Sequence, residues 1–350
     1  MKKYYTRACN FAYGKSSIKL VKKRINLPLN GNKKISFGQI EILTRTSIKI
    51  IDLKDIKKLP KSLKEKINKD LKIIVKKNKN FSGLNFNKIP NIMGILNLTP
   101  DSFSDGGKFN KKKTGISHAK NLFKSGADIV DVGGESTRPG SKPISKKEEW
   151  NRIKEILKNI NKKIPLSLDT RKSEIMNKGI QVGVKLINDV SGLSYDSETV
   201  EILKKSRTPF VIQHSQGTPE KMQKNPKYEN ELLDIYDFFE QKIKFLISMG
   251  IKHNNIMIDP GIGFGKNLKH NMNLIRCVSI FHTLGFPILL GLSRKKFIKD
   301  LSGKNDSKKR LGGTVASSLY AIMQGVQVLR IHDVNELTQS IMVFKELIKN

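Results

Sequence analysis

The chain has 350 residues, of which 37% are hydrophobic and 28% charged, and its formal net charge at pH 7 is +35. This length and composition are typical of a globular protein with one large α/β domain and a smaller element, or with two ordinary domains. No apolar run approaches the roughly 18 residues of a membrane span, and the basic N-terminus lacks the apolar core of a signal peptide, so we expect a cytoplasmic protein with no membrane partner.

Residues 1–89 are the most basic part of the chain, with 24 of its 66 Lys and Arg residues but only 5 of its 31 Asp and Glu residues. Such an excess can indicate nucleic acid, an anionic membrane or an anionic substrate as the partner. Most of it is Lys in a chain also rich in Ile and Asn, and no nucleic-acid-binding signature accompanies it. We therefore interpret the excess as compositional bias and expect no nucleic-acid partner.

The same region carries two patterns of regular structure. Alternating apolar residues over 34–56 predict strands, and the apolar spacing over 59–80 predicts a basic amphipathic helix. These patterns indicate that residues 1–89 form a small appended α+β element rather than a disordered tail.

Residues 90–350 alternate short apolar runs with segments of helical spacing, which is clearest over 146–160 and 229–250. The predicted strands are residues 92–99, 128–134, 164–170, 184–190, 209–215, 256–261, 287–293 and 328–334. Continuous apolar strands separated by helices indicate a parallel sheet that is covered on its outer face. Eight such units match the usual size, about 250 residues, of a (β/α)8 TIM barrel in the α/β class.

A doubly wound open sheet is the alternative architecture. It binds its ligand at one topological switch point, whereas a barrel recruits polar residues from the ends of many strands. Nearly every predicted strand here ends in such residues: Asn97, Thr99, Glu135, Asp169, Asn188, His214, Asp259, Ser293, Arg330 and His332. This distribution favours the barrel, at whose mouth these side chains would converge.

Two carboxylates, Asp169 and Asp259, follow apolar strands at positions where water is scarce. A buried carboxylate needs hydrogen-bond donors, which a ligand with paired N–H groups can supply. Either carboxylate alone is more simply explained as a helix cap. The two together, with Asn188 and Lys295 at the ends of other strands, favour a ligand site.

Basic and hydroxyl side chains gather after the last two strands. Residues 293–295 follow the seventh strand, and Arg330 and His332 lie on one face of the eighth. Barrels frequently bind phosphate at the loops after these two strands, so the residues together predict an anion site. Thr137 and Arg138 belong to a polar loop with Gly and Pro that suits a lid over a charged ligand.

Other kinds of site are not indicated. Cys9 and Cys277 are far apart and show no metal-ligand spacing, so we expect neither a disulfide framework nor a zinc site. The glycines of the segment DPGIGFGKN fit neither the dinucleotide-binding nor the phosphate-loop spacing, and no Ser or Thr follows Lys266. We interpret them as tight turns beneath a ligand. No G-x-S-x-G elbow supports Ser-His-Asp catalysis.

Seven segments together resemble the dihydropteroate synthase family, the pterin-binding barrels of folate synthesis that sulfonamides inhibit: IMGILNLTPDSFSDGG, DIVDVGGESTRPGS, LSLDTRK, INDVSG, IDPGIGFGKN, GLSRKKF and VLRIHDV. They occur in the family's order over residues 91 to about 345, and the first two are highly specific. The resemblance implies a transferase in which 4-aminobenzoate displaces diphosphate from (7,8-dihydropterin-6-yl)methyl diphosphate, giving 7,8-dihydropteroate. It also implies a Mg²⁺ cofactor and a homodimer through helices near the C-terminal end.

The resemblance further assigns the site residues. The pterin-binding residues are Asp169, Asn188, Asp259, Phe264 and Lys295. The diphosphate-binding residues are Asn97, which is also the Mg²⁺ ligand, Arg138, Arg330 and His332. The 4-aminobenzoate-binding residues are Phe103, Ser136, Thr137, Pro139 and Ser293. The catalytic residues are Asp169, Lys295, Arg330 and His332.

The resemblance also implies a mechanism. Because aromatic amines are weak nucleophiles, we expect the C–O bond to diphosphate to break before the amine attacks. Mg²⁺, Arg330 and His332 would stabilise the departing diphosphate, and Asp169 would offset positive charge on the pterin methylene. One departure from the family pattern is Ser215, which stands where Met often follows the His. Residues 1–89 are another, and they are too short for a fused pyrophosphokinase or aldolase domain.

Two other functions fit parts of the pattern. A methyltransferase-type pterin barrel that binds methyltetrahydrofolate needs no diphosphate site, so Arg138, Arg330 and His332 count against it. A catalytically inactive barrel, with a basic N-terminal region that binds RNA or another protein, is the second alternative. Candidates at every expected site position argue against it.

Overall fold

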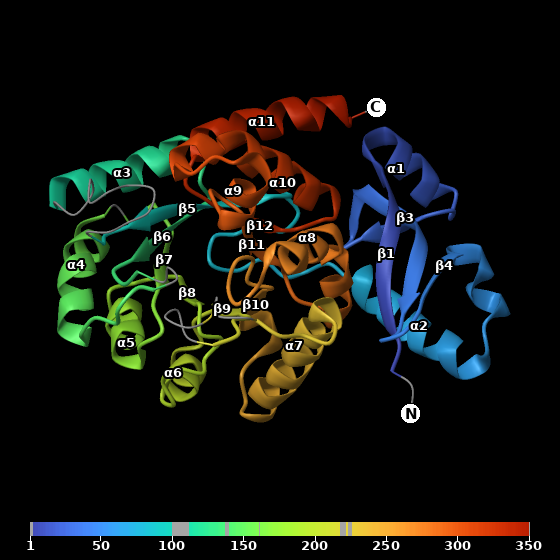
Figure 1. The fold of residues 1–350 in the computed structure, drawn as a ribbon, viewed down its shortest axis with the longest axis horizontal. Coiled ribbons are helices and arrows are strands. Elements are labelled where there is room, and N and C mark those ends of the chain that lie inside the picture. Colours follow the sequence, from blue (N-terminus) through green and yellow to red (C-terminus); the bar gives the residue numbers. More distant parts are fainter. Residues whose placement is uncertain are drawn as a thin grey trace.

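The computed structural model describes residues 3–99, 112–136, 140–160, 162–217, 222 and 226–349 (Figure 1). Within these residues it contains a four-stranded sheet near the N-terminus and an eight-stranded sheet in the rest of the chain. Figure 1 shows the two sheets side by side, each with its own helices.

The N-terminal sheet is antiparallel and is built around its longest strand, β3. Its elements are β1 (Tyr5–Tyr13), α1 (Gly14–Lys22), β2 (Leu27–Leu29), β3 (Asn32–Leu43), β4 (Ile48–Asp52), η1 (Leu53–Lys58) and α2 (Lys61–Ile74). β1, β2 and β4 all pair with β3. The strands expected within residues 34–56 and the helix expected within 59–80 are confirmed, whereas β1 and α1 were not predicted.

The second sheet is a parallel barrel. Its strands are β5 (Asn91–Asn97), β6 (Ile129–Gly133), β7 (Leu166–Asp169), β8 (Leu186–Asp189), β9 (Phe210–Gln213), β10 (Ile256–Asp259), β11 (Leu289–Gly291) and β12 (Val328–Ile331). They pair in the order β10-β9-β8-β7-β6-β5-β12-β11, and a parallel bridge between Ile258 and Ile288 joins the two ends. All eight predicted strands and the barrel are therefore confirmed, and the doubly wound alternative is wrong.

Helices cover the outside of the barrel. They are α3 (Lys112–Lys124), α4 (Lys146–Asn159), α5 (Ser173–Gln181), α6 (Thr199–Ser206), α7 (Glu231–Ser248), η2 (His253–Asn255), α8 (Leu268–Arg276), η3 (Val278–Leu284), α9 (Lys296–Ser302), η4 (Ser307–Arg310), α10 (Leu311–Met323) and α11 (Val334–Leu347). α4 begins where the Ser145 side chain accepts a hydrogen bond from the backbone of Glu148, which satisfies one amide of the first turn. None of the described helices is long and apolar enough to cross a membrane.

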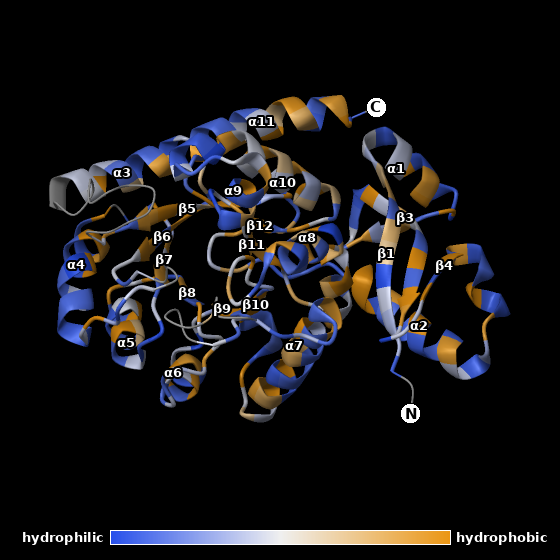
Figure 2. Ribbon diagram, viewed as in Figure 1, coloured by the Kyte–Doolittle hydropathy of each residue, from blue (hydrophilic) through white to orange (hydrophobic). Residues whose placement is uncertain are grey.

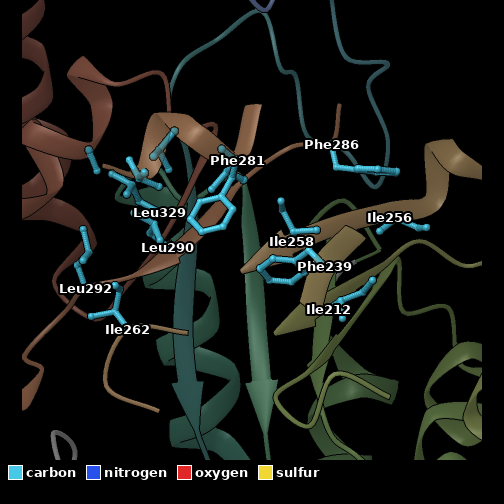
Figure 3. Packing of buried hydrophobic residues seen from close by; sticks show 14 of the residues in the cluster. Ile212, Phe239, Ile256, Ile258, Ile262, Phe281, Phe286, Leu290, Leu292 and Leu329 are labelled. Atoms are coloured by element: carbon cyan, nitrogen blue, oxygen red, sulfur yellow. The ribbon is translucent and has the colours of Figure 1, made fainter. Parts of the chain in front are cut away.

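The main core lies between the strands and this helical layer. Figure 2 shows the barrel strands as largely hydrophobic, and Figure 3 shows how the layer packs on them. Phe239 of α7 and Phe281 of η3 are fully buried against the outer face of the barrel, with ring centroids 5.9 Å apart. Burial of each such side chain contributes about 1.5–3 kcal/mol, so these contacts hold the strand ends in fixed positions.

The floor of the barrel, where the strands begin, is filled by a separate apolar cluster. Leu84 and Phe86, from the segment that leads into β5, pack there against inward-facing residues such as Met93, Val211 and Met257. Polar side chains can therefore gather inside the barrel only toward the carboxyl ends of its strands.

The N-terminal sheet contacts the outside of the barrel at α7 and η3. The Tyr5 hydroxyl donates to Asp237 of α7 at 2.9 Å, and Asn30 Nδ2 lies 3.1 Å from His282 Nδ1 of η3. Because η3 leads into β11, the Asn30–His282 contact lies at the end of the barrel where the strands begin, whereas Asp237 lies in the first half of a helix that follows β9.

Candidate active site

Above the apolar floor, the inward-facing side chains of the barrel become polar. Side chains two residues apart along a strand face the same side, so the residue two beyond an inward-facing Val211 or Met257 again faces inward. The residues of this polar layer are Asp131, Ser167, Asp169, Asn188, Gln213, Asp259 and Arg330. Asp131, Ser167 and Gln213 add to the predicted set, which contained the others.

Arg330 connects four strands through one hydrogen-bond network. Its Nε donates to Asp131 Oδ2 at 2.6 Å, and its Nη2 donates to Asp169 Oδ2 at 2.8 Å. Asn188 Nδ2 donates to the same Asp131 oxygen at 3.0 Å. Residues far apart in sequence on β6, β7, β8 and β12 thus meet inside the barrel, as their predicted convergence requires.

Burial dominates the acid–base properties of this network. It raises the pKa of Asp169 to about 8, although the charge of Arg330 acts in the opposite direction. Arg330 itself has a raised pKa, because Asp131 and Asp169 outweigh the cost of its burial. Asp169 can therefore exchange a proton near neutral pH, while the guanidinium stays charged.

A second cluster forms at the end of β10. Asp259 Oδ1 accepts a hydrogen bond from the Gly261 backbone at 2.7 Å, and burial raises the pKa of Asp259 to about 6. Lys295 Nζ lies 4.2 Å from the centroid of the Phe264 ring, within range of a cation–π contact. Burial lowers the pKa of Lys295 to about 8, while Asp259 opposes this shift. A carboxylate, an ammonium and an aromatic face therefore share one side of the mouth.

Lys266 ties the loops after β9 and β10 together. Its Nζ lies 3.0 Å from His214 Nδ1 and donates to the Phe264 carbonyl at 2.8 Å. Burial lowers the pKa of Lys266 to about 7. The predicted tight turns are confirmed nearby, since Gly261 has a φ of +71°, and a Cβ at that position would lie 1.9 Å from the His214 carbonyl oxygen. This loop therefore supports the aromatic face of the site rather than a phosphate.

The loops after β11 and β12 are joined by Ser293 and His332. Ser293 Oγ lies 3.0 Å from His332 Nδ1, and it also accepts a hydrogen bond from the His332 backbone at 3.3 Å. Arg294, by contrast, donates from Nε to Asp333 at 2.9 Å in a paired contact. The two loops thus hold His332 in a fixed orientation beside Arg330.

Asn97 lies at the end of β5, opposite Gly133 in the register of the sheet. A Cβ at Gly133 would lie 3.4 Å from the Asp169 Cβ and 3.7 Å from Asn97 Oδ1. A Cβ at Gly133 would therefore be in ordinary van der Waals contact with both the Asn97 amide oxygen and the Asp169 side chain.

The loop after β6 is anchored by buried ion pairs. Glu135 accepts from Arg171 Nε at 2.8 Å, from Lys172 Nζ at 2.9 Å and from the Ile144 backbone at 3.1 Å. These bonds lower the pKa of Glu135 against the effect of its burial. Ser136, the next residue, accepts at its carbonyl oxygen from a Ser hydroxyl five residues on, at 2.6 Å.

Four predicted site residues lie outside the described residues: Phe103, Thr137, Arg138 and Pro139. Of the others, the structure brings Asp169, Asn188, Asp259, Lys295 and Arg330 to one end of the barrel. Asp131 was missed, although an acidic residue inside the apolar run 128–134 was an available signal.

Comparison with known proteins agrees with this geometry. A protein family described as pterin binding enzymes matches residues 93–332. A dihydropteroate synthase from Neisseria meningitidis serogroup C is 41% identical over 263 residues, which is 74% of this chain and 93% of that protein. The one from Escherichia coli K12 is 39% identical over 256 residues, 73% of this chain and 90% of that protein.

Solved structures give the same result. The Yersinia pestis dihydropteroate synthase in complex with a sulfonamide drug superposes with a TM-score of 0.74 at 36% identity, covering 78% of this chain and 99% of that chain. The Thermus thermophilus dihydropteroate synthase in complex with 4-aminobenzoate gives a TM-score of 0.66 at 34% identity, covering 75% of this chain and 96% of that chain.

Proposed function

The chain belongs to the dihydropteroate synthase family of pterin binding enzymes, and from this we infer that it joins 4-aminobenzoate to the methylene carbon of (7,8-dihydropterin-6-yl)methyl diphosphate. The products are 7,8-dihydropteroate and diphosphate, as expected of a transferase (EC 2.5.1.15) of folate synthesis. The observation that carries this proposal is the buried network of Arg330, Asp131 and Asp169 beside Asp259, at the open end of a barrel.

Pterin recognition is proposed for the polar layer. Asp259, as a carboxylate, suits the paired donors at the 2-amino and N3 positions of the ring. Asn188 and Asp169 suit the other ring nitrogens, and Lys295 suits the O4 and N5 side. The Phe264 ring, already in contact with Lys295, supplies an apolar face for a flat heterocycle.

Diphosphate binding is proposed for Arg330 and His332, together with Asn97 and Arg138. Arg330 uses Nε and Nη2 for Asp131 and Asp169, and its Nη1 makes no hydrogen bond to the described residues. That group can therefore donate to a phosphate oxygen while the other two keep the guanidinium in place. The Ser293–His332 contact orients the imidazole beside it.

The 4-aminobenzoate site is proposed for Phe103, Ser136, Thr137, Pro139 and Ser293. Support among the described residues comes from Glu135, whose three hydrogen bonds fix the start of the loop that carries Ser136.

Ser215, where Met is usual, gives the pterin pocket a more polar wall than the family pattern implies.

Mg²⁺ is proposed as the cofactor. Among the residues that the structure describes, no group of three or more His, Cys, Asp or Glu side chains could hold a metal ion. Mg²⁺ commonly takes one or two protein oxygen ligands together with water and substrate phosphates, so the Asn97 amide oxygen, at the end of β5 and near the Asp169 side chain, fits it. When bound, Mg²⁺ would supply positive charge at the diphosphate.

The chemistry then follows from the arrangement of charges. The C–O bond breaks and its electron pair leaves with the diphosphate, which Arg330 and His332 hold. Positive charge left on the pterin methylene is offset by the carboxylates of the polar layer, whose effect is strong because they are buried. The amine nitrogen attacks this carbon and releases a proton, while the apolar floor excludes water from below.

We also propose that the chain divides into an appended element, residues 1–89, and the barrel, residues 90–350, and that the protein acts in the cytoplasm as a homodimer. Support for the dimer comes from large exposed apolar side chains on the last helices: Leu301, Tyr320, Met342, Val343 and Leu347. Large exposed apolar side chains on neighbouring elements are typical of a protein interface. Sedimentation velocity tests the dimer directly.

The decisive experiment measures diphosphate release with both substrates and Mg²⁺. Wild-type protein should turn over, and sulfamethoxazole should compete with 4-aminobenzoate. Asp259→Ala and Arg330→Ala should each lower kcat/KM by on the order of 100-fold or more while the circular dichroism spectrum is unchanged. A correctly folded wild type without turnover would reject the proposal in favour of an inactive barrel.

A further inference from the structure

Gln213, at the end of β9, is a buried polar residue whose amide nitrogen has no hydrogen-bond partner among the described residues. Its side chain faces the barrel interior, because Val211, two residues earlier, belongs to the apolar floor cluster, while Ile212 between them packs outward near Phe239 (Figure 3). Only 4% of the residue is exposed. An amide in this position loses its contacts with water and gains none in return from the protein.

The neighbours of Gln213 are the residues proposed to bind the pterin. Gln213 is paired with Asp259 on β10, and Val211 is paired with Asn188 on β8. The Gln213 Cγ also lies 3.3 Å from where a Cβ would stand at Gly261, whose amide donates to Asp259. Gln213 therefore lies between the strands of Asn188 and Asp259, at the level of the Asp259 carboxylate.

The polar layer as a whole has hydrogen-bonding capacity that the protein does not use. Its buried atoms without a partner among the described residues are Asp131 Oδ1, Ser167 Oγ, Asn188 Oδ1 and Gln213 Nε2. They come from four adjacent strands, β6 to β9. Unpaired buried polar groups are rare in folded proteins, so four in one layer indicate a polar ligand that completes them.

The kinds of atom in this set define what Gln213 can bind. Asp131 and Asn188 offer acceptors, because Asn188 Nδ2 already donates to Asp131. They suit ring N–H groups. The pterin also has an acceptor, N1, next to its 2-amino group, and it needs a donor. The unpaired donors of this layer are Gln213 Nε2 and the Ser167 hydroxyl. Ser167 lies opposite Leu186 of the apolar floor, whereas Gln213 lies opposite Asp259.

We propose that Gln213 is a specificity-determining residue that hydrogen-bonds to N1 and the 2-amino group of the pterin. Asp259 is assigned to the other side of the same amino group, together with N3. The amide would donate from Nε2 to N1 and accept at Oε1 from the amino group, the same pairing by which Gln recognises the acceptor–donor edge of adenine. The inference rests on the proposed function and adds a residue that the motifs do not include.

The test uses Gln213→Met, an unbranched apolar replacement of similar length, with Gln213→Leu as a second variant. The pterin substrate, (7,8-dihydropterin-6-yl)methyl diphosphate, is titrated by calorimetry. We expect its Kd to rise about tenfold or more, as for the loss of one or two hydrogen bonds. The KM for 4-aminobenzoate should stay within about twofold. An analogue without the 2-amino group keeps only the N1 contact, so the difference in Kd between wild type and variant should be smaller for it than for the pterin substrate.

Thermal stability separates recognition from a structural role. Removal of an unpaired buried amide should leave the melting temperature of the ligand-free protein unchanged or raise it, whereas removal of a structural amide lowers it. Gln327→Met is the matched control. Gln327 Nε2 is also unpaired among the described residues, but Gln327 Oε1 accepts from the Ile288 backbone at the floor end of the barrel. That variant should lose stability and keep the pterin Kd.

Three results would overturn the inference. If both Gln213 variants bind the pterin substrate like wild type while Asp259→Ala does not, Gln213 is not a recognition residue and the proposed function stands. If the Gln213 variants instead lose stability as Gln327→Met does, the residue is structural. If wild type binds no pterin at all, the proposed function fails as well.

Discussion

Arg330 and Asp131 form an ion pair inside the barrel, with Nε 2.6 Å from Oδ2 and the Asp131 side chain fully buried. Loss of one partner leaves the other charge buried and unpaired, which typically costs about 3–5 kcal/mol. Asp131→Ala should therefore lower the free energy of unfolding by about 3 kcal/mol, measured by denaturant titration. Glu148→Ala, which removes a half-exposed partner of Arg152, should cost less than about 1 kcal/mol. Equal effects of the two variants would contradict this account of Arg330.

The pKa of Asp259 predicts how pterin affinity depends on pH. Burial raises this pKa to about 6, so the folded protein holds the proton more tightly than the unfolded chain does. The stability that this proton contributes is present at low pH and is lost as pH rises through about 6. In the proposed pterin site, the ionised carboxylate is the form that would accept from the pterin N–H groups.

We therefore expect the Kd of 6-hydroxymethyl-7,8-dihydropterin, which carries no diphosphate, to rise by up to about tenfold per pH unit below pH 6. Asp259→Asn should remove this dependence on pH and leave any that belongs to Asp169, whose pKa burial raises to about 8. Fluorescence titration from pH 5 to 9 measures both. A step near pH 6 that persists in Asp259→Asn would assign it to another group.

Lys266 should make stability depend on pH in the opposite direction. Burial lowers its pKa to about 7, so between this value and the ordinary value of 10.5 the unfolded chain binds the extra proton. Stability therefore rises with pH across this window, by at most about 1.4 kcal/mol per unit. When the pH is raised from 7.5 to 9, the free energy of unfolding of wild type should increase by about 1–2 kcal/mol more than that of Lys266→Met. Lys269→Met, at an exposed position, should show no such difference.

The junction between the N-terminal sheet and the barrel depends on Asp237. This carboxylate accepts from the Tyr5 hydroxyl at 2.9 Å, from Lys3 at 2.7 Å and from Arg45 at 2.9 Å. Asp237→Ala should lower the free energy of unfolding by about 1–2 kcal/mol, with a smaller effect at high salt because the groups are partly exposed.

Turnover of the same variant should stay within about twofold of wild type, because Asp237 lies on α7 in the outer helical layer and its contacts are with the N-terminal element. Glu240→Ala is the control, since this residue contacts Lys3 but is half exposed. A large loss of turnover in Asp237→Ala would show that the junction reaches the site.

Much of the fold could be predicted because its strands are continuous apolar runs that end in polar residues. Asp169 and Asp259 stood out for that reason, and the barrel brings them together as expected. Asp131 did not stand out, because it lies inside an apolar run, and its importance depends on Arg330 reaching it from β12. Such a contact depends on how far the strands are staggered around the barrel, which no local pattern encodes.

The same limit applies to Gln213 and Lys266. A Gln at the end of a strand is unremarkable until its Nε2 proves to have no hydrogen-bond partner among the described residues. Lys266 was noted only because the glycines near it look like a phosphate loop. β1 was missed for a different reason: its Tyr and Arg side chains face the barrel, so the strand lacks the simple apolar alternation of β3.

The apolar floor of the barrel, to which Leu84 and Phe86 belong, has a kinetic consequence. With one end of the barrel sealed, the two substrates and both products must pass through a single opening. A pterin bound in the polar layer as proposed could not leave while 4-aminobenzoate covered it, so the order in which the substrates bind should govern how fast the enzyme works.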